Sequence, residues 1–134
     1  MNRWAGSRLP VALLLAALVS AAVADDYAAG EAAWQRGDHA AALAHWLPLA
    51  EDGHARAQFA VGLAHERGQG VEQNAAAAAR WYRRAAAQGL ADAEYNLALL
   101  YLDGRGVAQD LEQTVRLFRA AAEGGHLPAQ VNLA

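Results

Sequence analysis

Five histidines are the first candidates for metal binding or proton transfer in this 134-residue sequence. No two of them have the H-x-x-x-H spacing that brings two imidazoles to one face of a helix, and there is no cysteine. Serine occurs only at positions 7 and 20, so residues 25–134 offer no serine for a Ser-His-Asp triad. The sequence therefore predicts no catalytic, metal or cofactor site.

The arginines are the second set of candidate functional residues. Two of them recur in register 36 residues later, which gives the set Arg80, Arg83, Arg116 and Arg119. Residues three apart share a helical face, so two stacked helices would carry a basic strip, with Arg80 near Arg116 and Arg83 near Arg119. A solvated surface is the simpler interpretation, and a strip for an acidic partner or an anionic envelope polymer is the sharper one.

The net charge bears on the choice of partner. The sequence has 11 basic and 14 acidic residues, a formal net charge of −3. Nucleic-acid binding depends largely on basic charge that neutralises phosphates. No nucleic-acid partner is therefore expected.

The first 24 residues have the layout of a secretory signal peptide. Arg3 and Arg8 precede an apolar segment at 9–19, and Ala-Val-Ala at 22–24 fits the A-x-A cleavage pattern. The apolar segment has about 11 residues, whereas a membrane span needs about 20. We expect a periplasmic or secreted mature chain with no stable membrane span after cleavage; an uncleaved anchor or a buried core helix is the alternative.

A period of 36 residues organises the rest of the chain. Residues 57–92 and 93–128 share 11 identities in 36 positions. Most informative are the pairs in fixed register, Gly68/Gly104, Gly70/Gly106, Gly89/Gly125 and Val71/Val107. A repeat of this length is typical of a solenoid, in which stacked units bury one continuous core.

Each period contains two helices. Apolar spacing and glycine breakers predict helices at 27–36, 39–51, 57–66, 75–88 and 111–123. Asn74 and Asp110 precede the second helices as N-caps. Trp81 and Tyr82 are expected to fill the space between hairpins. The fold class is therefore all-α, an α/α superhelical solenoid of antiparallel helix hairpins.

The repeat motifs resemble a known family. WYRRAAAQG at 81–89, ADAEYNLALLY at 91–101 and GRGV at 104–107 are similar to the Sel-1-like repeats, relatives of the tetratricopeptide repeats. The chain is thus divided into a signal peptide (1–24), an N-terminal capping helical hairpin (25–56), two repeats (57–92 and 93–128) and a partial repeat (129–134).

The resemblance implies a function. Such repeats form superhelical scaffolds for protein interaction, so an exported, non-enzymatic scaffold that binds protein or peptide in the cell envelope is the favoured interpretation. The first helices of related folds line the concave surface, and their polar positions are the candidate partner-binding residues: Gln58, Glu94, Asn96, Gln130 and Asn132. The alternative is an envelope enzyme or enzyme modulator acting on peptidoglycan or β-lactams, although members of that subgroup are rich in disulfides.

The C-terminal end is also a candidate contact surface. Residues 129–134 repeat the start of a first helix and leave Val131 and Leu133 on a partly formed apolar face. A solenoid normally ends in a polar cap. Either the sequence is truncated there, or the open end docks onto a partner or a second copy of the chain.

Overall fold

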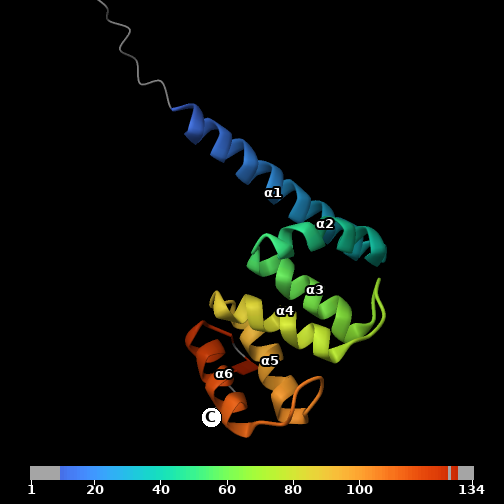
Figure 1. Ribbon diagram of the computed structural model, residues 1–134, viewed down its shortest axis with the longest axis vertical. Helices are drawn as coiled ribbons and strands as arrows, with labels where there is room; N and C mark the ends of the chain where they lie inside the picture. The colour runs from blue at the N-terminus through green and yellow to red at the C-terminus, as the bar shows by residue number, and fades with distance from the viewer. Residues whose placement is uncertain (1–9, 127, 130–134) are drawn as a thin grey trace, which may run out of the picture.

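Six helices form three stacked hairpins. A computed structural model of the chain describes residues 10–126 and 128–129, in which there are six α-helices and no strand. The helices are α1 (Val11–Gln35), α2 (His39–Glu51), α3 (Ala55–Arg67), α4 (Ala75–Ala87), α5 (Ala91–Asp103) and α6 (Leu111–Glu123). Each helix packs against the next one along the chain, so the hairpins α1–α2, α3–α4 and α5–α6 stack in order (Figure 1). The prediction of an all-α solenoid is confirmed.

Side-chain caps determine where the helices begin. Asn74 and Asp110 each accept a hydrogen bond from a backbone N–H three residues later, at 3.0 and 3.1 Å, as predicted for N-caps. Helix α3 begins at Ala55, two residues earlier than the sequence indicated. The reason is a cap that the sequence analysis missed, because His54 Nδ1 accepts from the backbone N–H of Ala57 at 3.0 Å.

The glycine loops hold each hairpin against the preceding one. Gly70 and Gly106 have φ of +78° and +69°, a region that side chains disfavour. A Cβ on Gly70 would lie 2.8 Å from the carbonyl carbon of His39, and one on Gly106 would lie 2.3 Å from that of Ala75. Since His39 and Ala75 each begin the second helix of the preceding hairpin, any side chain at these glycines would push the hairpins apart.

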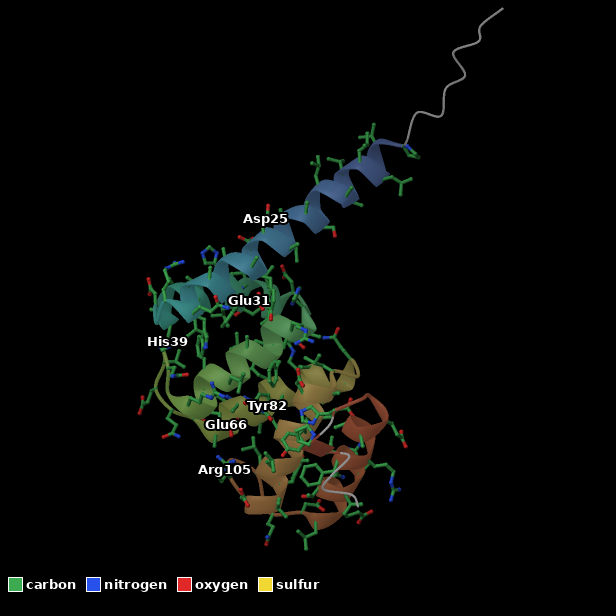
Figure 2. All side chains as sticks on the ribbon, turned by 180° about the vertical axis from the view of Figure 1, so that it is seen from behind. Asp25, Glu31, His39, Glu66, Tyr82 and Arg105 are labelled. Atoms are coloured by element: carbon green, nitrogen blue, oxygen red, sulfur yellow. The ribbon has the colours of Figure 1, made fainter. Side chains whose placement is uncertain are left out.

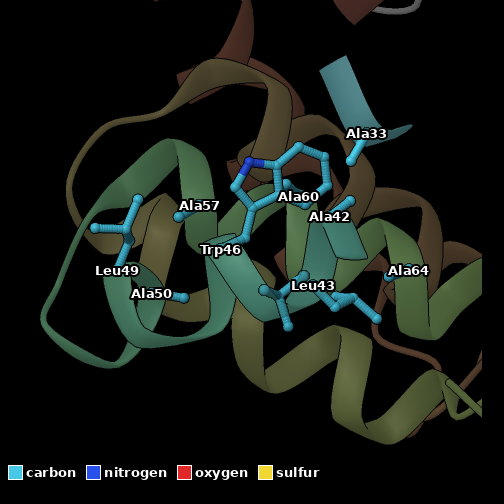
Figure 3. Packing of buried hydrophobic residues seen from close by; sticks show 10 residues of the cluster. Ala33, Ala42, Leu43, Trp46, Leu49, Ala50, Ala57, Ala60 and Ala64 are labelled. Atoms are coloured by element: carbon cyan, nitrogen blue, oxygen red, sulfur yellow. The ribbon is translucent and has the colours of Figure 1, made fainter. Parts of the chain in front are cut away.

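Small alanines packed around larger apolar residues make the two core clusters. Most of the first core cluster is alanine, packed around Trp46 and Leu43 (Figure 3). In the second cluster Tyr82 is fully buried. Trp81 is only half-buried, and the guanidinium carbon of Arg84 lies 4.9 Å from its ring centroid. The expectation that both aromatic residues fill the space between hairpins is correct for Tyr82, and Trp81 also packs against the first core cluster while it stays half-buried.

Gly62 makes room for the Tyr82 ring. A Cβ at Gly62 would lie 2.6 Å from Tyr82 Cε1, well inside van der Waals contact. We expect Gly62→Ala to lower the free energy of unfolding by about 1–3 kcal/mol because it overpacks this contact. This loss would occur although alanine favours helix by about 1 kcal/mol over glycine.

Urea unfolding of a double-mutant cycle checks the cause. With Tyr82→Ala as background, the ring is gone, and Gly62→Ala should then be neutral or stabilising. An equal loss in both backgrounds would show that the clash with Tyr82 is not responsible.

Candidate binding surfaces

The N-terminal part of α1 lies away from the hairpin array (Figure 1). Its apolar side chains are 49–71 % exposed: Val11, Leu13, Leu14, Leu15, Leu18 and Val19. The buried residues of α1 are Gly30 and Ala33, near its C-terminal end. By length and hydropathy, α1 is the one helix of the described residues that could cross a membrane, a test that signal sequences also pass.

A pocket of about 220 Å³ opens between α1 and α3, over Trp46 of α2. We call it the aromatic pocket; it is lined by Tyr27, Glu31, Trp34, Gln35, Trp46, Arg56, Phe59, Ala60 and Leu63. Trp46 Nε1 donates to the backbone oxygen of Tyr27 at 3.1 Å, and the Trp34 and Trp46 ring centroids lie 5.5 Å apart. The indole of Trp46 thereby fixes the floor of the pocket.

Opposite charges stand on two sides of this pocket. Glu31 of α1 and Arg56 of α3 are both exposed, and Figure 2 shows Glu31 on the part of α1 that meets the array. Burial, and then the negative charge of Glu31, raise the pKa of the Tyr27 hydroxyl. Arg56 Nη1 lies 3.5 Å from Asp92 Oδ2 of the next hairpin. The pocket thus combines apolar walls with one carboxylate and one guanidinium.

No binding role was predicted for the residues of this pocket from the sequence. A signal was available, because Tyr27 and Trp34 are seven residues apart and therefore share a helical face. The helical pattern does not show, however, that Phe59 and Leu63 of the next hairpin lie opposite them.

Two of the predicted partner-binding residues are buried instead of lining an exposed surface. Gln58 is 1 % exposed and Glu94 is 7 % exposed. Gln58 Nε2 donates to the backbone oxygen of Ala50 at 3.0 Å, and its Oε1 accepts from Gln88 Nε2 at 3.0 Å. Gln58 therefore links α2, α3 and the end of α4 inside the chain.

Asn96 is half-buried and belongs to a network between hairpins. Its Nδ2 donates to the Tyr82 hydroxyl at 3.4 Å, and that hydroxyl donates to Glu66. Arg105 Nη2 lies 3.4 Å from the other carboxylate oxygen of Glu66 (Figure 2). Burial, followed by the contact with Glu66, raises the pKa of Tyr82, so this hydroxyl stays protonated as a donor. Gln130 and Asn132 lie outside the described residues.

The four arginines of the predicted basic strip are all exposed. Arg83 Nη2 donates to the Tyr101 hydroxyl at 3.0 Å, and Arg116 donates to Gln113 Oε1 at 3.0 and 2.7 Å. A cavity of about 240 Å³ between α4 and α6, with α5 as its third wall, brings Arg83 and Arg116 together, a pair that the sequence did not indicate. We call it the Glu94 cavity; its lining is Arg83, Ala86, Ala87, Glu94, Leu97, Arg116 and Leu117.

Histidine, aspartate and glutamate form no metal-binding group within residues 10–126 and 128–129. The two histidines that precede first helices have structural contacts. His54 and His126 each accept from a backbone N–H at the start of the following helix, and each stacks on a tyrosine ring, with centroid distances of 5.1 and 4.3 Å. The geometry therefore offers binding surfaces more than reactive groups.

With this arrangement established, comparison with known proteins assigns the class. Residues 55–90 and 91–126 match the Sel1 repeat, so the chain belongs to the Sel1 repeat family. Proteins built from such repeats typically act as protein-interaction scaffolds. No curated protein matches the chain.

Two solved structures give more particular likenesses. A Sel1 repeat protein from Oxalobacter formigenes is 32 % identical, with a TM-score of 0.76 over 79 % of this chain and 44 % of its own. A protective antigen, c5321, present in uropathogenic Escherichia coli strains and displaying an SLR fold, is 30 % identical, with a TM-score of 0.76 over 92 % of this chain and 27 % of its own. The chain thus spans less than half the length of either relative.

His65 makes folding stability depend on pH. Burial, and then the charge of Arg80, lower its pKa, and His65 Nδ1 is buried with no hydrogen-bond partner among the described residues. The unfolded chain therefore binds this proton more tightly, so the stability contributed by neutral His65 is lost as the pH falls below about 6.5. We expect His65→Gln to reduce the loss of unfolding free energy between pH 7.5 and pH 5.5.

Urea unfolding at both pH values measures this difference. The matched control is His45→Gln, at a side chain that is 41 % exposed, and it should keep the difference seen in the unmodified chain. The same loss in His65→Gln as in the unmodified chain would contradict the assignment.

Proposed function

We propose that the chain is an exported, non-enzymatic scaffold that binds a polypeptide segment of a partner protein at the aromatic pocket. The pocket itself carries the proposal. Aromatic walls joined to a few polar groups are typical of sites at which one side chain anchors a partner. A volume of about 220 Å³ suits a single large apolar side chain.

The charged residues of the pocket favour a polypeptide over a purely apolar ligand. Glu31 offers acceptors and Arg56 offers donors on opposite walls. An extended peptide presents both N–H and C=O groups on either side of each side chain. A peptide can therefore insert an apolar residue and satisfy both charged groups with its backbone.

The contacts of α1 support export. Its buried residues, Gly30 and Ala33, lie after the predicted cleavage site, as does the Tyr27 carbonyl that holds Trp46. Of the described residues before that site, 10–24, only Val23 is among the partly buried residues of the first core cluster. Loss of residues 1–24 would therefore leave the first hairpin with most of its contacts.

The basic strip, the asparagine positions and self-association through the C-terminal end stay predictions. Of these candidates, Arg80 and Arg119 remain exposed for an acidic partner, while Arg83 and Arg116 also face the Glu94 cavity.

Export has a direct test. When the full chain is expressed in a bacterium, we expect it in the periplasmic or extracellular fraction with Asp25 as its first residue. N-terminal sequencing of the purified protein measures this. An Ala22→Arg, Ala24→Arg variant, which destroys the small-residue pattern, should retain residues 1–24. Recovery of the unmodified chain in the cytoplasm with residues 1–24 still attached would contradict export.

Peptide binding can be tested with a peptide series and one substitution in the lining of the pocket. We expect labelled heptapeptides with a central tryptophan or leucine to bind more tightly than one with a central alanine. Ala60 lines the pocket and is replaced by the larger Asn96 in the next repeat. Ala60→Leu should therefore fill the pocket and weaken binding about tenfold or more, which corresponds to about 1.4 kcal/mol.

Fluorescence anisotropy measures these affinities, with melting curves as the check on folding. The matched control is Leu111→Ala, at an apolar side chain that is 59 % exposed on α6 and outside the pocket. Equal affinity for all three peptides, or no effect of Ala60→Leu, would show that the pocket is not the docking site.

A further inference from the structure

The Glu94 cavity differs from its counterpart in the preceding hairpin. The residue at the Glu94 position is Gln58 one period earlier, and Gln58 has partners for both ends of its amide. Gln88 Nε2, one of those partners, also donates to the Gly53 backbone oxygen at 2.8 Å. The earlier position is therefore filled and hydrogen-bonded within the chain.

Three larger residues around Gln58 are replaced by smaller ones around Glu94. One period after Trp81, Arg84 and Gln88, the chain has Leu117, Ala120 and Gly124. In the earlier hairpin these larger side chains cover the surface: Arg84 Nη2 donates to the Glu51 backbone oxygen at 3.2 Å and also lies over the Trp81 ring. Of these positions Leu117 lines the cavity of about 240 Å³, and the smaller residues at 120 and 124 provide no side chain that could reach over it as Arg84 and Gln88 do one period earlier.

Glu94 lies in this cavity as an unpaired carboxyl group. The residue is 7 % exposed, its carboxylate accepts no hydrogen bond from the described residues, and its oxygens are not fully buried, so they are open to the cavity. Partial desolvation raises the pKa of Glu94, with Arg116 opposing the shift. The chain thus has an accessible carboxyl group without a hydrogen-bond donor at the position where the preceding repeat has an amide with partners at both ends.

The other residues that line the Glu94 cavity limit the class of ligand that it could bind. Arg83 and Arg116 contribute two guanidinium groups, and Leu97 and Leu117 contribute apolar surface. A simple anion would face Glu94, and a simple cation would face both arginines. A ligand that carries an ammonium and a carboxylate on one small framework satisfies both sides.

We propose that the Glu94 cavity binds a free α-amino acid. Its ammonium group donates to the Glu94 carboxylate, its carboxylate accepts from Arg83 and Arg116, and its side chain rests against Leu97 and Leu117. This site is separate from the aromatic pocket, so the scaffold has a small-molecule site in addition to its peptide site.

Isothermal titration and NMR on the full chain test the ligand class. The probes are glycine and the L- and D-forms of alanine and leucine, and we expect saturable binding with shifts of the amide signals around Glu94. N-acetyl-L-alanine lacks the ammonium and L-alaninamide lacks the carboxylate, so each should bind at least tenfold more weakly than L-alanine. A tripeptide with only one free terminus should behave like these analogues.

Two variants test the location. Gly124→Gln restores the residue type that fills the counterpart, and the φ of −78° at Gly124 accepts a side chain. Because its Cβ would lie 3.1 Å from Ala91 Cβ, a small adjustment is needed, and melting curves check that the variant folds. We expect it to abolish amino-acid binding, whereas the control Leu111→Ala, at an exposed side chain outside this cavity, leaves binding unchanged.

Glu94→Gln gives a second, opposite readout. It should weaken amino-acid binding at least tenfold while raising the melting temperature at pH 7, because it removes a carboxylate whose charged form is disfavoured by desolvation. Absence of saturable binding by every amino acid tested, equal binding of the acetylated or amidated forms, or binding that survives Gly124→Gln would each overturn the proposal. Since none of these residues lines the aromatic pocket, peptide affinity tests the proposed scaffold function independently.

Discussion

The array depends on the buried Tyr82 ring, which occupies the space that Gly62 leaves on α3. The same side chain reaches two further elements, since its hydroxyl donates to Glu66 at the end of α3 and accepts from Asn96 on α5. Arg105, in the next loop, contacts the other oxygen of Glu66. One residue therefore fixes the spacing of α3 and α4 and the placement of the following hairpin. In a chain without disulfides, this combination of apolar contact and satisfied polar groups stabilises the stack.

The repeat supplies a common backbone, and the differences between equivalent positions supply the surfaces. Gln73 and Gln109, 36 residues apart, donate to the backbone in the same way, at 2.9 Å in each case. By contrast, Gln58 and Glu94 occupy one position with opposite consequences, because one is satisfied within the chain and the other is not. Contacts that recur at equivalent positions of the two repeats thus stabilise the fold. Positions at which the two repeats differ in residue type indicate where a ligand can bind.

The sequence predicted most of the helices, the Asn74 and Asp110 caps and the glycine loops, because these depend on residues close together along the chain. The 36-residue period then determined the stacking order. It did not predict that Gln58 is buried, since this depends on Gln88 of the facing helix, or that Trp81 is half-covered, since Arg84 lies over its ring. The aromatic pocket was not predicted for a related reason, because its two walls come from different hairpins. A repeat pattern predicts which elements pack together, whereas side-chain burial depends on the particular residues at each crossing.

Helix α1 continues without interruption through the predicted cleavage site, and this has an electrostatic consequence. In the full chain Asp25 and Asp26 are ordinary mid-helix residues, of which Asp26 lies 3.7 Å from His45. A chain that begins at Asp25 would start inside this helix, with both carboxylates in its first turn. There they would face the positive end of the helix macrodipole and the new α-ammonium group. Signal-peptide cleavage would therefore move Asp25 and Asp26 from mid-helix positions, where the helix macrodipole does not favour a negative charge, to the first turn, where it does. The two carboxylates would then stabilise the N-terminus of the shortened helix.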